Sequence, residues 1–250
     1  MSATLKLGFT IIETMLFLSI TGLLIVGFLA ATGSSINIQR YHDSVQSLQS
    51  KLQDQYAEVV DVSNAIPSNT LSCDSNAVVT ESASTFGRGQ SDCVLMGRYI
   101  TSSGTDGKNL TISDVVGNAK MSLPTDSSDL TTLQNYYLNI VPTTTETYSL
   151  EWGSAFQKTG STDPLLFTML ILRSPASGVV RTFINPTAVL DGANIGTMIT
   201  ATDLAVSTNS LKGCVESGGL FNGNRMAVTV EAGASSGTGV GTLAEDSSGC

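Results

Sequence analysis

The chain has 250 residues and a formal net charge of −9, and its twelve lysine and arginine residues are scattered along it. Neutralising nucleic-acid phosphates requires grouped basic side chains, so tight DNA binding by this chain alone is not expected. Charged residues make up only 13% of the chain, against about 25% in soluble domains. Hydroxyl and amide side chains replace them, which is typical of extracellular β-rich proteins.

The first element is an apolar segment, Phe9–Ala31, in which Glu13 is the one charged residue. The segment is long enough to cross a bilayer as a helix. A secretory signal peptide would have a shorter apolar region followed by a cleavage site, whereas here Gly8 marks a junction before the apolar run. Lys6 precedes the segment, so we expect a cytoplasmic N-terminus, a single span of the cytoplasmic membrane and an extracellular remainder.

The stretch KLGFTIIETMLFLSITGLL resembles the processing site and N-terminal helix of type IV pilins and pseudopilins. The resemblance implies that a prepilin peptidase cleaves after Gly8 and that the new amine of Phe9 is methylated. It also implies that other pilin subunits and a pilus assembly platform are the partners. The matching residues are Gly8, Phe9, Thr10, Ile12, Glu13 and Gly22.

Placing a carboxylate inside hydrocarbon is unfavourable by a few kcal/mol, so the presence of Glu13 in this segment needs an explanation. The resemblance supplies one, because the methylated amine of Phe9 on a neighbouring subunit would neutralise Glu13 and set the axial register of the two helices. Such a buried pair contributes specificity more than stability. Thr10 and Gly22 are the other implied assembly residues, and small residues such as Gly22 and Gly27 let membrane helices approach closely. The alternative is a lone glutamate that reaches the lipid headgroups.

An apolar stripe with helical spacing follows the apolar segment. It predicts one helix of about 50 residues from Phe9 to about Asp61, with Gly33–Ser35 as a flexible joint. The stripe should cover a sheet, since it is too short for a free coiled coil. His42 lies among polar neighbours and is interpreted as a surface residue. The stripe consists of Tyr41, Val45, Leu48, Leu52, Tyr56 and Val59.

The remaining chain has short apolar runs separated by turn residues, which predicts an antiparallel sheet. The fold class is therefore α+β, with the long helix packed on the sheet in the layout of pilins. One short extra helix is expected over Asp129–Tyr137. The expected strands are Cys93–Thr101, Asn109–Ser113, Thr147–Trp152, Leu165–Arg173, Val179–Ile184, Leu211–Glu216 and Arg225–Glu231. The expected hairpin turns are 102–109, 174–178 and 221–224.

These elements divide the chain into four parts. Residues 1–8 are the leader, and 9–32 form the helix of the membrane or the filament core. Residues 33–63 form the amphipathic continuation of that helix, and 64–250 form the extracellular β-rich domain, whose C-terminal region is bounded by a disulfide.

Catalytic motifs are absent from the sequence, so an enzyme is not expected, and neither a cofactor nor a metal ion is predicted. The glycine-rich stretch 233–242 lacks the lysine and helix of a phosphate-binding loop and is interpreted as a flexible loop. Asp106 and Asp114 lack the spacing of a calcium loop and are assigned to a turn.

The four cysteines, Cys73, Cys93, Cys214 and Cys250, lack the spacing of a metal site. Three pairings are possible, and we favour Cys73–Cys93 and Cys214–Cys250 because each pair brackets a local strand-and-turn segment. Four buried free thiols are the alternative. The resemblance to pilins makes both bracketed segments candidates for subunit contacts or ligand recognition.

The leading functional hypothesis is a minor pilin, a structural subunit of a type IV pilus or of a related pseudopilus. The length and the long polar loops favour a low-copy or tip position over the major subunit. One alternative is a pseudopilin of a type II secretion system. Another is a single-span surface binding protein, such as an adhesin, that never polymerises. That protein would need neither Gly8 cleavage nor Glu13.

Overall fold

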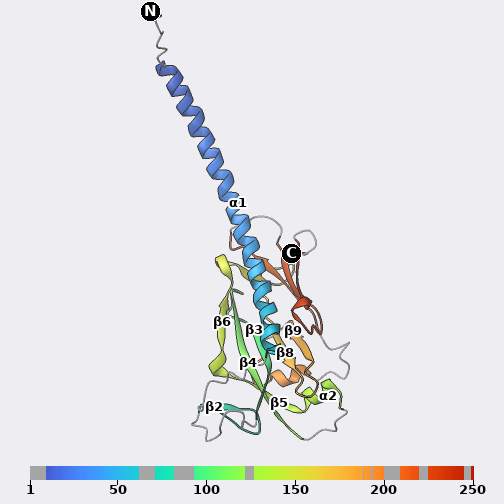
Figure 1. The fold of residues 1–250 in the computed structure, drawn as a ribbon. Helices are drawn as coiled ribbons and strands as arrows, with labels where there is room; N and C mark the ends of the chain where they lie inside the picture. Colours follow the sequence, from blue (N-terminus) through green and yellow to red (C-terminus); the bar gives the residue numbers. More distant parts are fainter. Residues whose placement is uncertain are drawn as a thin grey trace, which may run out of the picture.

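The computed structural model describes residues 10–61, 71–81, 93–121, 127–187, 189–192, 194–199, 209–219, 225–244 and 249–250. In these residues one long N-terminal helix leads into an antiparallel β domain (Figure 1). The α+β class and the order of helix before sheet are confirmed.

The helix α1 runs from Ile11 to Val60 and begins at Thr10, whose side chain accepts a hydrogen bond from the backbone N–H of Glu13. It is regular helix through Gly33–Ser35, where the sequence predicts a joint. All six residues of the predicted stripe are buried, with at most 4% of their surface exposed. Two polar residues, Ser44 and Gln55, are buried on the same face. The prediction of one long helix with an amphipathic second half is therefore confirmed.

The larger sheet has the order β5-β4-β3-β8-β9, with β6 paired to β4 beside β5, and all its pairings are antiparallel. The pairing of β3 with β4 shifts register between Leu95 and Gly97, and Gly97 lies so close to β8 that a Cβ there would be 1.9 Å from the carbonyl oxygen of Ile171. The strands are β3 (Val94–Ser103), β4 (Asn109–Ala119), β5 (Tyr136–Ile140), β6 (Glu146–Ser149), β8 (Thr168–Arg173) and β9 (Val180–Asn185).

A second antiparallel sheet has the order β12-β11-β10-β7. Its strands are β7 (Ala155–Gln157), β10 (Leu211–Glu216), β11 (Ala227–Val230) and β12 (Val240–Leu243). A separate hairpin pairs β1 (Leu71–Cys73) with β2 (Val79–Glu81). The short helices are α2 (Asp129–Gln134), η1 (Pro142–Thr144), η2 (Glu151–Gly153), η3 (Ile195–Ile199) and η4 (Gly237–Gly239).

The stripe of α1 joins both large sheets in one apolar core. Its side chains pack in the same cluster as Ile112 and Met169 of the larger sheet and Val215 and Val228 of the smaller one. The opposite face of the larger sheet forms a second core, covered by α2 and η3. The sheet therefore lies between α1 on one face and two short helices on the other.

Several predicted boundaries differ from the structure. The helix expected over Asp129–Tyr137 ends at Gln134, because Tyr136 and Tyr137 pair with the end of β4. The strand expected over Thr147–Trp152 stops at Ser149, where η2 follows. The prediction of a loop at 233–242 is wrong in part, because this stretch contains η4 and most of β12. The turn expected at 221–224 lies outside the described residues.

Two disulfides join Cys73 to Cys93 and Cys214 to Cys250, which are the pairs that the sequence favours. The first ties the β1–β2 hairpin to the start of β3, and the second ties the C-terminal residue to β10. Such bonds form and persist in oxidising compartments, so they are consistent with a β domain outside the cytoplasm.

Candidate functional site

The N-terminal half of α1 projects from the β domain as a free apolar rod (Figure 1). Its large apolar side chains between Ile11 and Leu29 are 51–78% exposed. The helix is long and apolar enough to cross a membrane. An apolar surface of this size is stable in water only when lipid or another protein covers it.

Hydroxyl groups within the rod are satisfied by its own backbone. Thr14 donates to the carbonyl of Ile11 at 2.9 Å, and Ser19 donates to that of Leu16 at 2.9 Å. Thr21 and Thr32 bond carbonyls of the preceding turn in the same way. Because these hydroxyls need no outside partner, they are compatible with a hydrocarbon environment.

Glu13 is the exception among the polar side chains of the rod. Its carboxylate makes no hydrogen bond or ion pair with any residue that the structure describes, and its side chain is exposed. Thr10 and Glu13 do meet through the backbone, since the Glu13 N–H donates to Thr10 Oγ1 at 3.3 Å and to Thr10 O at 3.1 Å. The pattern Thr-x-x-Glu is that of a capping box. Only the threonine half of the box is formed, because the Glu13 carboxylate makes no bond to the Thr10 N–H; sequence reasoning missed this cap although the spacing was readable.

Gly22 and Gly27 lie on open stretches of the rod. A Cβ built at either position meets no atom within 4 Å, so the fold of this chain does not require glycine there. Glycine in a helix interior is unfavourable by about 1 kcal/mol relative to alanine. A close approach by another helix would explain both residues.

Gly8 and Phe9, with residues 1–7, lie outside the described residues. Of the predicted processing and assembly residues, the structure therefore places Thr10, Glu13 and Gly22 on the exposed rod. It brings Thr10 and Glu13 together, while Gly22 lies more than two turns further along the helix.

Two buried tyrosines attach α1 to the β domain. The Tyr41 hydroxyl donates to the carbonyl of Val215 at 3.0 Å and accepts from the N–H of Met226 at 2.6 Å, which ties α1 to β10 and to the start of β11. The Tyr56 hydroxyl lies 2.9 Å from Thr182 Oγ1 in β9. Burial raises the pKa of Tyr56 to about 12, because the phenolate would be poorly solvated there.

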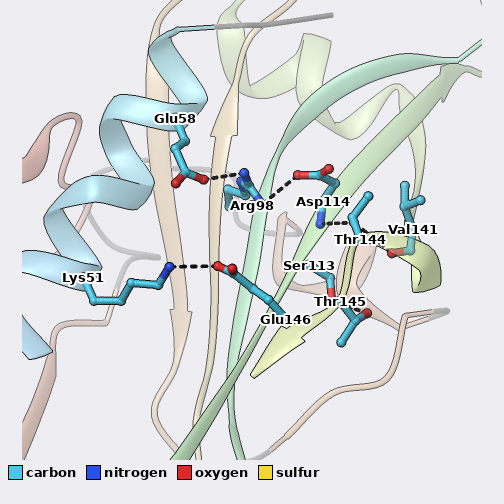
Figure 2. A network of polar contacts seen from close by, with 9 residues as sticks. All are labelled: Lys51, Glu58, Arg98, Ser113, Asp114, Val141, Thr144, Thr145 and Glu146. Carbon is cyan, nitrogen blue, oxygen red and sulfur yellow. Dashed lines mark hydrogen bonds and ion pairs between the residues drawn. The ribbon is translucent and has the colours of Figure 1, made fainter. Parts of the chain in front are cut away.

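Charged groups hold the last turns of α1 on the larger sheet (Figure 2). Arg98 of β3 lies between Glu58 of α1 and Asp114 of β4, and its Nη1 is 2.9 Å from Asp114 Oδ1. Arg98 and Asp114 are register partners across the two strands. A second pair joins Lys51 Nζ to Glu146 Oε1 at 2.9 Å. The rod is thus continuous with a helix whose charged side chains are paired with β3 and β6.

Burial raises the pKa of the Asp114 carboxyl above its usual range, although the nearby Arg98 guanidinium and the Thr144 hydroxyl act in the opposite direction. Thr144 Oγ1 also accepts from the Asp114 N–H at 3.0 Å. Asp106, the other acid weighed for calcium, accepts from the N–H of Lys108 at 3.1 Å within a turn. Among the described residues, no group of three or more metal-ligating side chains occurs.

Gln55 is a polar residue on the buried apolar face of α1. Its side chain is fully buried on the stripe of α1, and neither amide atom has a hydrogen-bond partner among the described residues. Each such group left without a partner is unfavourable by about 1–3 kcal/mol.

Comparisons of the chain with known protein families, with curated proteins and with solved structures found no match.

Proposed function

We propose that this chain is a structural subunit of a membrane-assembled filament, a minor pilin of a type IV pilus or a related pseudopilus. The observation that supports this most is the exposed apolar half of α1, which continues without a break into a helix anchored in the β domain. A helix of this kind can stand in lipid before assembly and can pack against copies of itself afterwards, while its anchored half carries the β domain outward.

The proposal assigns a role to the one unsatisfied charge of the rod. Cleavage after Gly8 would leave the amine of Phe9 one helical turn from Glu13, about 6 Å along the axis. On a neighbouring subunit this amine would neutralise the Glu13 carboxylate and set the axial offset between subunits. The partners are then other pilin subunits, a prepilin peptidase and an assembly platform, with the cytoplasmic membrane as the starting location and the cell surface as the final one.

Replacement of Glu13 by Gln tests this role better than replacement by Ala. Glutamine can still complete a capping box, whereas it carries no charge. We expect Glu13→Gln and Glu13→Ala to enter the membrane fraction as the parent does, and both to be lost from filaments sheared off native cells. Thr14→Ala is a matched control, because the Thr14 hydroxyl bonds only its own helix; this variant should assemble normally.

Two results would contradict the proposal. If Glu13→Gln assembled normally while Glu13→Ala did not, the residue would act as a cap and not as a charge. If all three variants assembled as the parent does, Glu13 would have no part in assembly. A single-span adhesin that never polymerises would instead show no filament-bound protein at all.

A further inference from the structure

Trp152 is the only tryptophan of the chain, and it lies in the turn η2 that follows β6. β6 pairs with the beginning of β4, from Asn109 to Ile112. In Figure 1 the yellow turn after β6 lies at the end of the β domain from which the exposed rod projects. The indole is 51% exposed. A large apolar side chain is therefore displayed at the end of the domain nearest the apolar rod.

The backbone of this turn has an unusual conformation. Trp152 has φ 56°, in the left-handed region that bulky residues rarely adopt, and Gly153 follows with φ 74°. Such a conformation persists only where surrounding contacts hold it. Conformations of this kind are concentrated at functional positions of proteins.

Three contacts with α1 hold the turn in place. The Ser44 hydroxyl donates to the carbonyl of Glu151 at 3.3 Å, and the Ser47 hydroxyl donates to the Glu151 carboxylate at 3.0 Å. The Arg40 guanidinium lies over the Trp152 ring, with Cζ 4.7 Å from the ring centroid. The guanidinium and the indole thus form one unit, the Trp152–Arg40 unit, which has an apolar and a cationic part. The contacts with α1 fix its position on that helix.

The position of this unit along α1 follows from helix geometry. Arg40 is eight residues beyond Thr32, the end of the apolar rod, which is about 12 Å along the axis. Helical side chains lean toward the N-terminus by up to one turn, so the guanidinium, with the indole against it, lies about 7–12 Å from the end of the rod. The headgroup layer outside the hydrocarbon is about 5–8 Å thick on each side of a bilayer.

We propose that the Trp152–Arg40 unit lies in the lipid headgroup layer and seats the β domain on the outer face of the membrane before assembly. The inference rests on the proposal that the rod crosses a bilayer. Indole is favoured at membrane interfaces because it is apolar with one polar N–H, and guanidinium binds phosphate through paired hydrogen bonds. Ile36 is 47% exposed on α1 between the rod and Arg40, and it adds apolar surface at the same depth.

The single tryptophan makes the test specific, because all tryptophan fluorescence of the full-length protein comes from this turn. The protein is reconstituted into vesicles of phosphatidylcholine and phosphatidylglycerol that carry a nitroxide quencher either at the headgroup or near the end of the acyl chain. The control is the double variant Trp152→Phe, Tyr137→Trp. Tyr137 is 43% exposed and pairs with Asn118 at the other end of β4, about 25 Å away along the strand.

Flotation of the vesicles first shows whether the rod inserts, which separates failure of the span from failure of this inference. In vesicles that float with the protein, we expect Trp152 to be quenched several-fold more by headgroup nitroxide than by acyl-chain nitroxide. We also expect acrylamide in the water phase to quench it several-fold less than it quenches the control tryptophan.

Equal acrylamide quenching of both tryptophans, with no quenching of Trp152 by either lipid, would overturn the inference. Shielding of Trp152 only in assembled filaments and not in vesicles would also overturn it, because the turn would then contact a neighbouring subunit. Arg40→Gln provides an independent measurement. Removal of the guanidinium should weaken headgroup quenching of Trp152. Unchanged quenching would show that Arg40 does not help to hold the turn in the headgroup layer.

Discussion

Replacement of Arg98 by Met tests how α1 is held on the larger sheet. The change keeps an unbranched apolar side chain but removes the ion pairs with Glu58 and Asp114. The Glu58 side chain is 41% exposed, so its pair contributes less than about 1 kcal/mol. Asp114 is only 20% exposed, and leaving its charge without a partner costs about 1–3 kcal/mol. We therefore expect a loss of about 2–3 kcal/mol of unfolding free energy at neutral pH.

The loss should depend on pH in a defined direction. The pKa of Asp114 is raised by burial even beside Arg98, and removal of the guanidinium raises it further. A native state whose carboxyl has a raised pKa binds more protons than the unfolded state, so stability increases as the pH falls through that pKa. The difference between Arg98→Met and the parent should therefore shrink as the pH falls from about 7 to about 4.

Urea unfolding of the full-length protein in detergent, followed through the fluorescence of Trp152, measures both effects. The double variant Arg98→Met, Asp114→Asn leaves only the exposed Glu58 carboxylate without its partner, so it should recover most of the lost stability and should lose the pH dependence. Lys51→Met is the matched control, because it breaks the more exposed pair with Glu146 and should change stability by less than about 1 kcal/mol. A loss for Arg98→Met that is the same at every pH, or that Asp114→Asn does not reduce, would refute the reasoning.

Three further changes test the core and the cross-links by urea unfolding. Gln55→Leu removes two buried amide atoms without partners and should stabilise the protein by about 1–3 kcal/mol; destabilisation would show that the amide is satisfied. Tyr56 has a pKa raised to about 12, so the unfolded state releases its proton first and stability falls as the pH rises from about 10 to about 12. Tyr56→Phe should make this fall shallower, and an unchanged slope would contradict it. Joint replacement of Cys214 and Cys250 by Ser removes a disulfide with a sequence separation of 36 and should lower the unfolding free energy by about 3–4 kcal/mol. An unchanged unfolding free energy would contradict this prediction and would show that the loop stays closed without the bond.

Local periodicity was sufficient to predict α1. The stripe from Tyr41 to Val59 repeats every three or four residues, and all of its members are buried. The extra buried residues, Ser44 and Gln55, lie on the same face at helical spacing, but a polar residue carries no signal for burial. Periodicity therefore predicted which face of α1 is buried. It did not predict that Ser44 and Gln55 are buried on that face as well.

Strands that depend on a distant partner were not predictable in the same way. β12 is four residues long and begins within a glycine-rich stretch, so its own residues do not favour a strand. It forms because β11 pairs with it and because Gln49 and Gln53 donate to the carbonyl of Val240 at 3.3 and 3.1 Å. The partners of Arg98 were missed for a similar reason, since its contact with Asp114 depends on strand register and its contact with Glu58 depends on where α1 crosses the sheet.

At the candidate site, the sequence predicted the apolar rod and the isolated Glu13, and the structure added the cap at Thr10. The spacing of Trp152 and Arg40, 112 positions apart in the sequence, gave no indication of their contact. Contacts within one helix can be read from spacing, whereas contacts between a helix and a loop require the tertiary fold.

The mass of the N-terminal peptide of the protein isolated from its native membrane or filament tests the central claim most directly. Assembly through the Glu13 charge requires a free amine one turn away, so the peptide should begin at Phe9 and should carry one methyl group on that amine. A peptide that retains residues 1–8, or that begins at any other residue, would contradict the proposed assembly.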